Sequence, residues 1–73
     1  MIRYKVYTIE KGIVETDVYD EVYSLTYHRL DGPAYIEYNK NSNIQCTEYW
    51  INDIRYTKEQ YEKELLKLKV QSL

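Results

Sequence analysis

The chain has very little of the residues that join small domains by covalent or metal cross-links. Its 73 residues include one cysteine, Cys46, and one histidine, His28. A disulfide within the chain needs two cysteines and a zinc site needs several Cys or His ligands, so neither can form. No acidic spacing resembles a calcium loop or an iron-binding triad. We therefore expect no metal or other cofactor, and self-association is the remaining way to compensate for a thin core.

Glycine, proline and phenylalanine are also scarce, and long apolar runs are missing. The chain has two glycines, one proline and no phenylalanine, against ten tyrosines and one tryptophan. No apolar stretch approaches the ~20 residues that cross a bilayer, and the N-terminus lacks the apolar core of a signal peptide. We therefore expect a cytoplasmic protein that does not engage a membrane. The lone thiol of Cys46 is expected to be buried in a strand as a small apolar residue.

An excess of positive charge is missing too. The net charge is −2, from 10 Lys and Arg against 12 Asp and Glu, which gives no general attraction to phosphate backbones. Acidic residues gather in residues 10–21, whereas lysines gather in residues 58–69. Glu15 and Asp17 are therefore predicted to provide electrostatic complementarity to a basic partner.

Alternating apolar and polar residues predict antiparallel strands joined by short turns. Gly12 supplies the positive φ that a hairpin loop needs, and Asn52-Asp53 is predicted to form a two-residue turn. We expect residues 1–73 to form a single domain, with an N-terminal hairpin at 1–20, a second hairpin unit at 21–56 and a helix at 57–71. The expected strands are residues 2–7, 13–19, 21–27, 34–38, 44–51 and 54–56.

The pattern changes to a helical one after residue 56. Thr57 followed by Gln60 is a capping box, the usual signature of a helix N-terminus. Tyr61, Leu65 and Leu68 then share one helix face and are predicted to dock on the sheet or to mediate dimerisation. The fold class is therefore α+β, with an antiparallel sheet of about five strands and one C-terminal helix packed on a face.

The tyrosines suggest a binding surface. Tyrosine suits a half-buried position where the ring is covered and the hydroxyl meets water or a partner. Alternation places rings on both faces of the sheet, so one face should be an exposed aromatic patch. If Tyr4, Ile36 and Tyr38 face the helix, the other side carries Tyr7, Tyr35 and Tyr49. Tyr35, Tyr49 and Trp50 are the predicted partner contacts.

The run His28-Arg29-Leu30-Asp31-Gly32-Pro33-Ala34 is a strong break between strands. An imidazole oriented by a carboxylate could act as a general base, which would make His28 and Asp31 catalytic. The alternative is that both side chains hydrogen-bond the backbone of their own tight turn, and the spacing across Gly32 and Pro33 favours it. We therefore predict a structural turn at His28, Asp31, Gly32 and Pro33, and no catalytic residues.

Residues 26–57 resemble a repeat found in bacteriophage, large DNA virus and some bacterial proteins, similar to MORN-type β-hairpin arrays. The resemblance rests on residues 28–34, the alternating strand up to Tyr38, and the run Glu48-Tyr49-Trp50-Ile51-Asn52-Asp53. The chain departs from the repeat because it has one complete copy and because Asn52-Asp53 stands where Asn-Gly is expected. The resemblance implies a phage-encoded origin and no established chemistry.

These features together predict a non-enzymatic binding module. The resemblance and the size favour a small phage protein that binds and inhibits or modulates a host protein, including a bacterial defence component. A second copy of the chain is another possible partner. The alternative is an aromatic platform for single-stranded nucleic acid or a nucleotide. That alternative has only Arg3, Lys5, Arg29 and Arg55 to contact phosphates.

Overall fold

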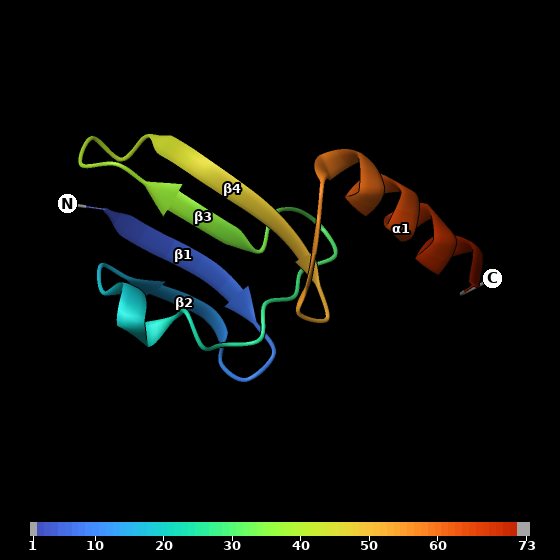
Figure 1. Cartoon of the computed structure of the whole chain (residues 1–73), viewed down its shortest axis with the longest axis horizontal. Coiled ribbons are helices and arrows are strands. Elements are labelled where there is room, and N and C mark those ends of the chain that lie inside the picture. Colours follow the sequence, from blue (N-terminus) through green and yellow to red (C-terminus); the bar gives the residue numbers. More distant parts are fainter. Residues whose placement is uncertain (1, 72–73) are drawn as a thin grey trace.

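Five strands pair antiparallel in one sheet, and a helix follows the last strand (Figure 1). The computed structural model describes residues 2–71. The sheet order is β2-β1-β3-β4-β5. Consecutive strands pair as hairpins, except that β3 pairs with β1 instead of with β2. The predicted α+β fold is confirmed. The elements are β1 (Arg3–Thr8), β2 (Gly12–Thr16), the 3-10 helix η1 (Tyr19–Glu21), β3 (Tyr35–Tyr38), β4 (Ile44–Ile51), β5 (Ile54–Tyr56) and α1 (Lys58–Gln71).

The hairpin turns have the backbone conformations that their residues predict. Gly12, where β2 begins, has a φ of 68°, a value that glycine adopts without steric penalty. Asn52 and Asp53 between β4 and β5 have φ values of 49° and 66°. Positive φ at both central residues is the signature of a type I′ turn, whose twist matches that of the flanking strands. Both predicted turns are confirmed.

The prediction of a strand at residues 21–27 is wrong. Residues 19–27 instead form η1 and a run of turns, in which the amides of Val22 and Tyr23 both donate to the carbonyl of Tyr19. Only Tyr27 forms a bridge, to Thr8. The side chain of Val22 is completely buried against the sheet, so the segment crosses a sheet face instead of extending an edge. Burial of its β-branched and aromatic residues outweighs their preference for strands.

The core lies between this crossing segment and the sheet. Val6, Val22, Tyr27, Ala34 and Tyr35 form one cluster, each with 6% or less of its surface exposed. The register places Val6 opposite Tyr35 and therefore sets which side chains share a face.

The register also corrects the predicted division of the faces. Tyr4 lies opposite Glu37, which puts its side chain on the same face as Tyr35 rather than on the opposite one. Ile36 and Tyr38 share the other face with Tyr7, which the prediction had separated from them. The covered face packs beneath residues 17–26 rather than beneath the helix.

Helix α1 begins with the predicted capping box. The amide of Thr57 donates to Gln60 Oε1 at 3.1 Å, and the amide of Gln60 donates to Thr57 Oγ1 at 3.2 Å. The helix contacts β4 and β5 and projects away from the sheet, so the molecule is elongated at 43 × 24 × 15 Å (Figure 1). No helix within residues 2–71 has the length and apolar character needed to cross a membrane.

Candidate functional site

Six aromatic side chains touch in succession across the covered face of the sheet, and we call them the ring chain. Successive ring centroids are 6.0, 5.4, 6.1, 5.8 and 5.2 Å apart. These separations lie within the range in which aromatic pairs attract one another beyond their burial. Residues 19–27 supply three of the rings, and strands β1, β3 and β4 supply one each. In order, the members are Tyr23, Tyr19, Tyr4, Tyr35, Tyr27 and Trp50.

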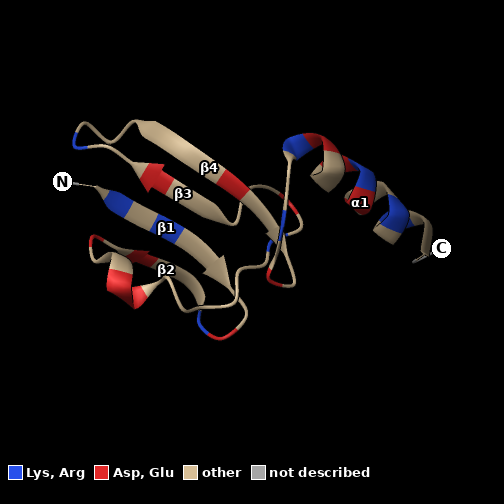
Figure 2. Ribbon diagram, in the orientation of Figure 1, with Lys and Arg blue, Asp and Glu red and all other residues tan. Residues whose placement is uncertain are grey.

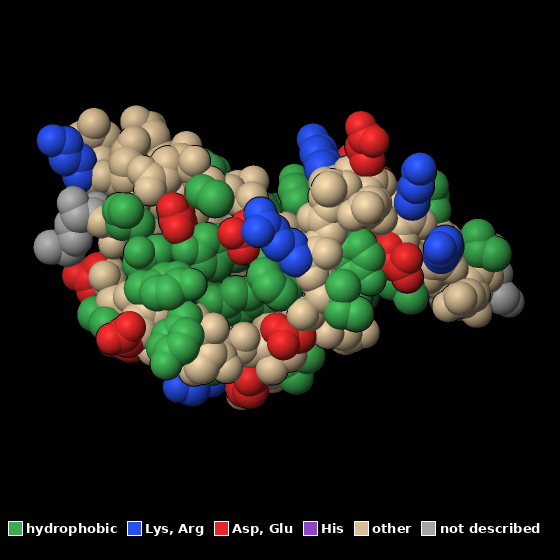
Figure 3. Space-filling model, in the orientation of Figure 1, with side chains coloured by type: hydrophobic (Ala, Val, Ile, Leu, Met, Phe, Trp, Pro, Cys, Tyr) green, Lys and Arg blue, Asp and Glu red, His purple; other side chains and the backbone are tan. Residues whose placement is uncertain are grey.

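Exposure rises along the ring chain from its inner to its outer members. Tyr27 and Tyr35 are 6% and 5% exposed, whereas Tyr19 and Tyr23 are 48% and 60% exposed. Figure 3 shows the result as a continuous hydrophobic surface over the sheet, with acidic side chains around it. The prediction that Tyr35 contacts a partner from an exposed position is therefore wrong. Tyr35 lies opposite Val6 in the sheet, and this register puts it in the core.

Two carboxylates lie on the same face as the ring chain and are held by its polar atoms. The hydroxyl of Tyr35 donates to Glu37 Oε1, and Gln45 Nε2 donates to Glu37 Oε2 at 3.1 Å. The indole Nε1 of Trp50 donates to Glu48 Oε1 at 3.0 Å. Because bonded donors fix both groups, their negative charge is presented beside the rings in a defined position.

Burial raises the pKa of two phenols and of the thiol on this face. Burial raises the pKa of Tyr27 to about 12. Burial, followed by the hydrogen bond to Glu37, also raises the pKa of Tyr35. Cys46 lies on the same face and is half-buried, whereas a buried packing role was expected. Its pKa is raised by burial and then by Glu37 and Glu48, so at neutral pH it is a thiol and not a reactive thiolate.

A cationic side chain already lies beside one of the two carboxylates. Arg55 Nη2 is 3.8 Å from Glu48 Oε2, and the Arg55 side chain is 62% exposed. Arg55 lies opposite Trp50 in the β4–β5 pairing. Two further acidic residues, Asp20 and Glu21, lie in η1, which also carries Tyr19. Figure 2 shows acidic residues in red on the short helical turn beside β2. The face therefore combines aromatic rings with a predominantly acidic rim.

The other predicted contact residues lie elsewhere. Glu15 lies on the opposite face, across from Lys5 in the β1–β2 pairing, and Asp17 follows the end of β2. Tyr49 packs on the helix residue Tyr61, with ring centroids 4.8 Å apart. Of the five predicted partner contacts, only Trp50 is both on the ring chain and partly exposed.

The accessible rings that sequence reasoning missed are Tyr19 and Tyr23. Both had been assigned to extended segments, in which their rings would not have met. Their spacing of four residues within an acidic stretch is the one available signal, because it brings two side chains together in a helical turn.

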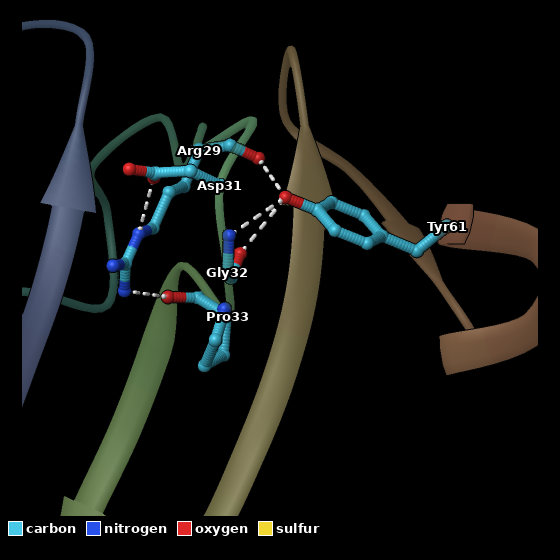
Figure 4. Close-up of polar contacts among 5 residues, drawn as sticks. All are labelled: Arg29, Asp31, Gly32, Pro33 and Tyr61. Carbon is cyan, nitrogen blue, oxygen red and sulfur yellow. Dashed lines mark hydrogen bonds and ion pairs between the residues drawn. The ribbon is translucent and has the colours of Figure 1, made fainter. Parts of the chain in front are cut away.

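The loop at residues 28–34 is built around the Arg29 guanidinium (Figure 4). Nε donates to Asp31 Oδ1 at 2.8 Å, and Nη1 donates to the carbonyl of Pro33 at 3.0 Å. The guanidinium carbon also lies 3.8 Å from the centroid of the Tyr7 ring. A Cβ on Gly32 would approach that carbon to 2.9 Å, so the glycine makes room for the arginine.

Tyr61 joins the helix to the same loop. Its hydroxyl lies 2.6 Å from the carbonyl of Arg29 and 2.9 Å from that of Gly32, which accept its proton, and it accepts from the amide of Gly32 at 3.2 Å (Figure 4). Tyr61 is 3% exposed, and burial raises its pKa. Tyr61 therefore docks the helix on the loop of its own chain, as one of the two predicted roles required.

His28 and Asp31 bind different partners from those predicted. His28 Nδ1 accepts a hydrogen bond from the amide of Asn52 at 2.9 Å, which ties the loop to the β4–β5 turn. Asp31 pairs with the Arg29 side chain, and that bond and charge hold its pKa below the usual value. The two residues therefore anchor the loop to its surroundings and to Arg29, instead of both capping the backbone of their own turn.

Within residues 2–71 no cluster of three or more His, Cys, Asp or Glu side chains is placed to hold a metal ion. No protein-family model matches the chain, and no curated protein and no solved structure is significantly similar to it. Inference about its function therefore rests on the surfaces that its own residues form.

Proposed function

We propose that the chain is a non-enzymatic binding module whose ring chain holds a lysine- or arginine-bearing segment of a partner protein. The observation that supports this is the combination of exposed rings and fixed carboxylates on one face. Tyr19 and Tyr23 present their rings there, and Glu37 and Glu48 are held beside the inner rings.

The chemistry of this face suits a cation. The face of an aromatic ring attracts an ammonium or guanidinium group, and a nearby carboxylate adds a charge-assisted hydrogen bond. The Arg55 guanidinium beside Glu48 is an example within the chain itself. Tyrosine rings have few rotatable bonds, so little conformational entropy is lost when a partner orders them.

Nucleobase stacking is the second candidate. The rings of Tyr19 and Tyr23 are stacked, with an interplanar angle of 23°, and such a pair would accept a base. The carboxylates of Glu37 and Glu48 would repel the accompanying phosphates, whereas they would attract a basic peptide. The acidic rim therefore favours a basic protein segment over a nucleic acid.

The identity of the partner protein rests on the viral resemblance of residues 28–34. If the chain is phage-encoded, the basic segment belongs to a host protein that the chain inhibits or modulates. Pull-down from bacterial lysate should then recover one stoichiometric protein with wild-type chain, and less of it with Glu48→Gln.

The proposal is tested directly with a short glycine-spaced Lys/Arg peptide, using the fluorescence of Trp50, the only tryptophan. We expect Tyr23→Ala and Glu48→Gln each to weaken binding by roughly threefold to tenfold, because the first removes an exposed ring and the second removes the charge of a partly buried carboxylate. The glutamine retains an acceptor for the indole and removes only the charge. Glu15→Gln is the matched control, since it removes the same charge on the opposite face.

Two results would contradict the proposal. An equal loss of affinity with Glu15→Gln and Glu48→Gln would show attraction to net charge rather than to this face. Stronger binding of a single-stranded oligonucleotide than of the peptide, with a steep dependence on salt, would favour the stacking candidate instead.

A further inference from the structure

The outer turns of α1 carry an apolar groove that the rest of the described chain leaves open. Its volume is about 720 Å³, and it is lined by Leu30, Glu62, Leu65, Leu66, Leu68 and Lys69. Leu66 is 63% exposed and Leu30 is 48% exposed. Figure 1 shows these turns projecting beyond the sheet. An exposed apolar surface of this kind marks an interaction site.

The helix has little to stabilise it on its own. It has 14 residues, and Tyr61 is the only one of them that is buried. Helices shorter than about 12–15 residues are marginally stable in water unless an apolar face packs on something. A partner lying along the outer turns would supply that packing.

The groove residues repeat at the spacing of a packing face. Glu62, Leu65, Leu66 and Lys69 stand at i, i+3, i+4 and i+7, so they form one stripe along the helix. The stripe is symmetric about the bond between Leu65 and Leu66. Glu62 and Lys69 stand equally far from that bond in opposite directions and have opposite charges.

We propose that a second copy of this chain covers the groove, with the two α1 helices antiparallel and a two-fold axis between Leu65 and Leu66. In that arrangement Leu65 of each copy packs on Leu66 of the other. Glu62 of each copy lies opposite Lys69 of the other, so the ion pair occurs twice. A parallel pair in register would place Glu62 against Glu62 and Lys69 against Lys69. The charges therefore select the antiparallel dimer.

The dimer uses a surface separate from the ring chain. Tyr61 remains bound to the loop at residues 28–34, because its side of the helix faces the sheet end. Each dimer would thus present two ring chains, and a partner with two basic segments would bind with avidity. The self-association itself does not depend on the proposed function.

The interface is small, so the expected dimer is weak. A helix of this length spans about 20 Å. Two such helices bury less than the standard interface of a stable complex, so we expect a weak dimer with a Kd of roughly 0.1 mM.

Sedimentation velocity of the full chain over a range of concentrations tests the proposal with a charge swap. Glu62→Lys alone and Lys69→Glu alone each oppose like charges at both contacts, and each should sediment as a monomer where the wild type dimerises. An equimolar mixture of the two variants opposes unlike charges at both contacts and should form a heterodimer. Circular dichroism confirms that both variants fold.

Three outcomes would overturn the proposal. The wild type could stay monomeric up to about 1 mM, well above the expected Kd. The single variants could dimerise as tightly as the wild type. The mixture could remain monomeric while the wild type dimerises, which would place the contact on another surface. Tyr23→Ala, which tests the ring chain, should leave self-association unchanged, so failure of one proposal is distinguishable from failure of the other.

Discussion

In the body of the protein, residues 3–56, the five side chains of the core cluster are each no more than 6% exposed, whereas among the described residues of α1 only Tyr61 is buried. Ring contacts, strand pairing and the loop at residues 28–34 hold the body together. The helix is attached to that body chiefly through one hydroxyl and one ring contact. One region is therefore packed around its own core, while the other leaves most of its apolar side chains exposed.

The largest expected effect is in the core of the body. Tyr27→Ala removes a ring that touches Tyr35 and Trp50 and a hydroxyl that donates to the carbonyl of Val22 at 2.7 Å. We expect a loss of about 3–5 kcal/mol in the free energy of unfolding, enough to unfold a domain of this size. Urea denaturation followed by circular dichroism measures it. Leu66→Ala, on the exposed part of the helix, should change stability by less than about 0.5 kcal/mol.

The second-largest expected effect is in the loop at residues 28–34, which contacts both regions. Gly32→Ala should destabilise the chain by roughly 2 kcal/mol, because φ is 155°, which residues with a side chain rarely adopt, and because its Cβ would displace the end of the Arg29 side chain. The matched control is Gly12→Ala, where φ is also positive but no atom lies within 4 Å. It should lose only about 1 kcal/mol. Equal losses for the two variants would show that the packing of Arg29 contributes nothing.

Removing the hydroxyl that anchors the helix should separate the two regions. Tyr61→Phe keeps the ring and loses the bonds to Arg29 and Gly32, for an expected loss of about 1–2 kcal/mol. Hydrogen exchange should accelerate in α1 and change little in β1 and β3. Tyr23→Phe, at a site that is 60% exposed, should have no measurable effect. Uniform acceleration across the chain would contradict the division into a stable body and a weakly attached helix.

The last expected effect is a loss of stability that appears only at alkaline pH. The folded state raises the pKa of Tyr27 from 10.0 to about 12 because burial disfavours the phenolate. The unfolded chain therefore loses this proton first, so the stability is fully present below pH 10 and is lost as the pH rises towards 12. Tyr27→Phe should flatten the decline in stability over this range, measured by urea denaturation at several pH values. An unchanged slope would mean that Tyr27 titrates alike in both states.

Local sequence signals predicted the ends of elements well. The reciprocal Thr57 and Gln60 bonds and the Asn52-Asp53 turn depend only on residues within one turn of each other. Residues 21–27 were mistaken for a strand because their side chains have strand preferences, while their backbone is decided by where Val22 can be buried. That choice depends on the distant strand residues that form the rest of the core.

The candidate site was harder to predict for the same reason. The ring chain exists because Val6 lies opposite Tyr35, a pairing across some thirty residues that alternation alone does not specify. Trp50 was predicted as a contact from the aromatic content of the chain and from the motif around it. The contact between Tyr19 and Tyr23 needs a helical turn that was not expected. The groove on α1 could be recognised only in part, since Leu65 and Leu68 were predicted without the charges of Glu62 and Lys69.

The central claim, that the body and the helix offer two separate surfaces, is tested most directly by titrating the isotope-labelled chain with the glycine-spaced Lys/Arg peptide and recording amide and side-chain chemical shifts. We expect changes at Tyr19, Tyr23, Glu48 and the Trp50 indole, with α1 from Glu62 to Lys69 unchanged. Changes confined to α1, or spread evenly over all the acidic residues, would contradict it.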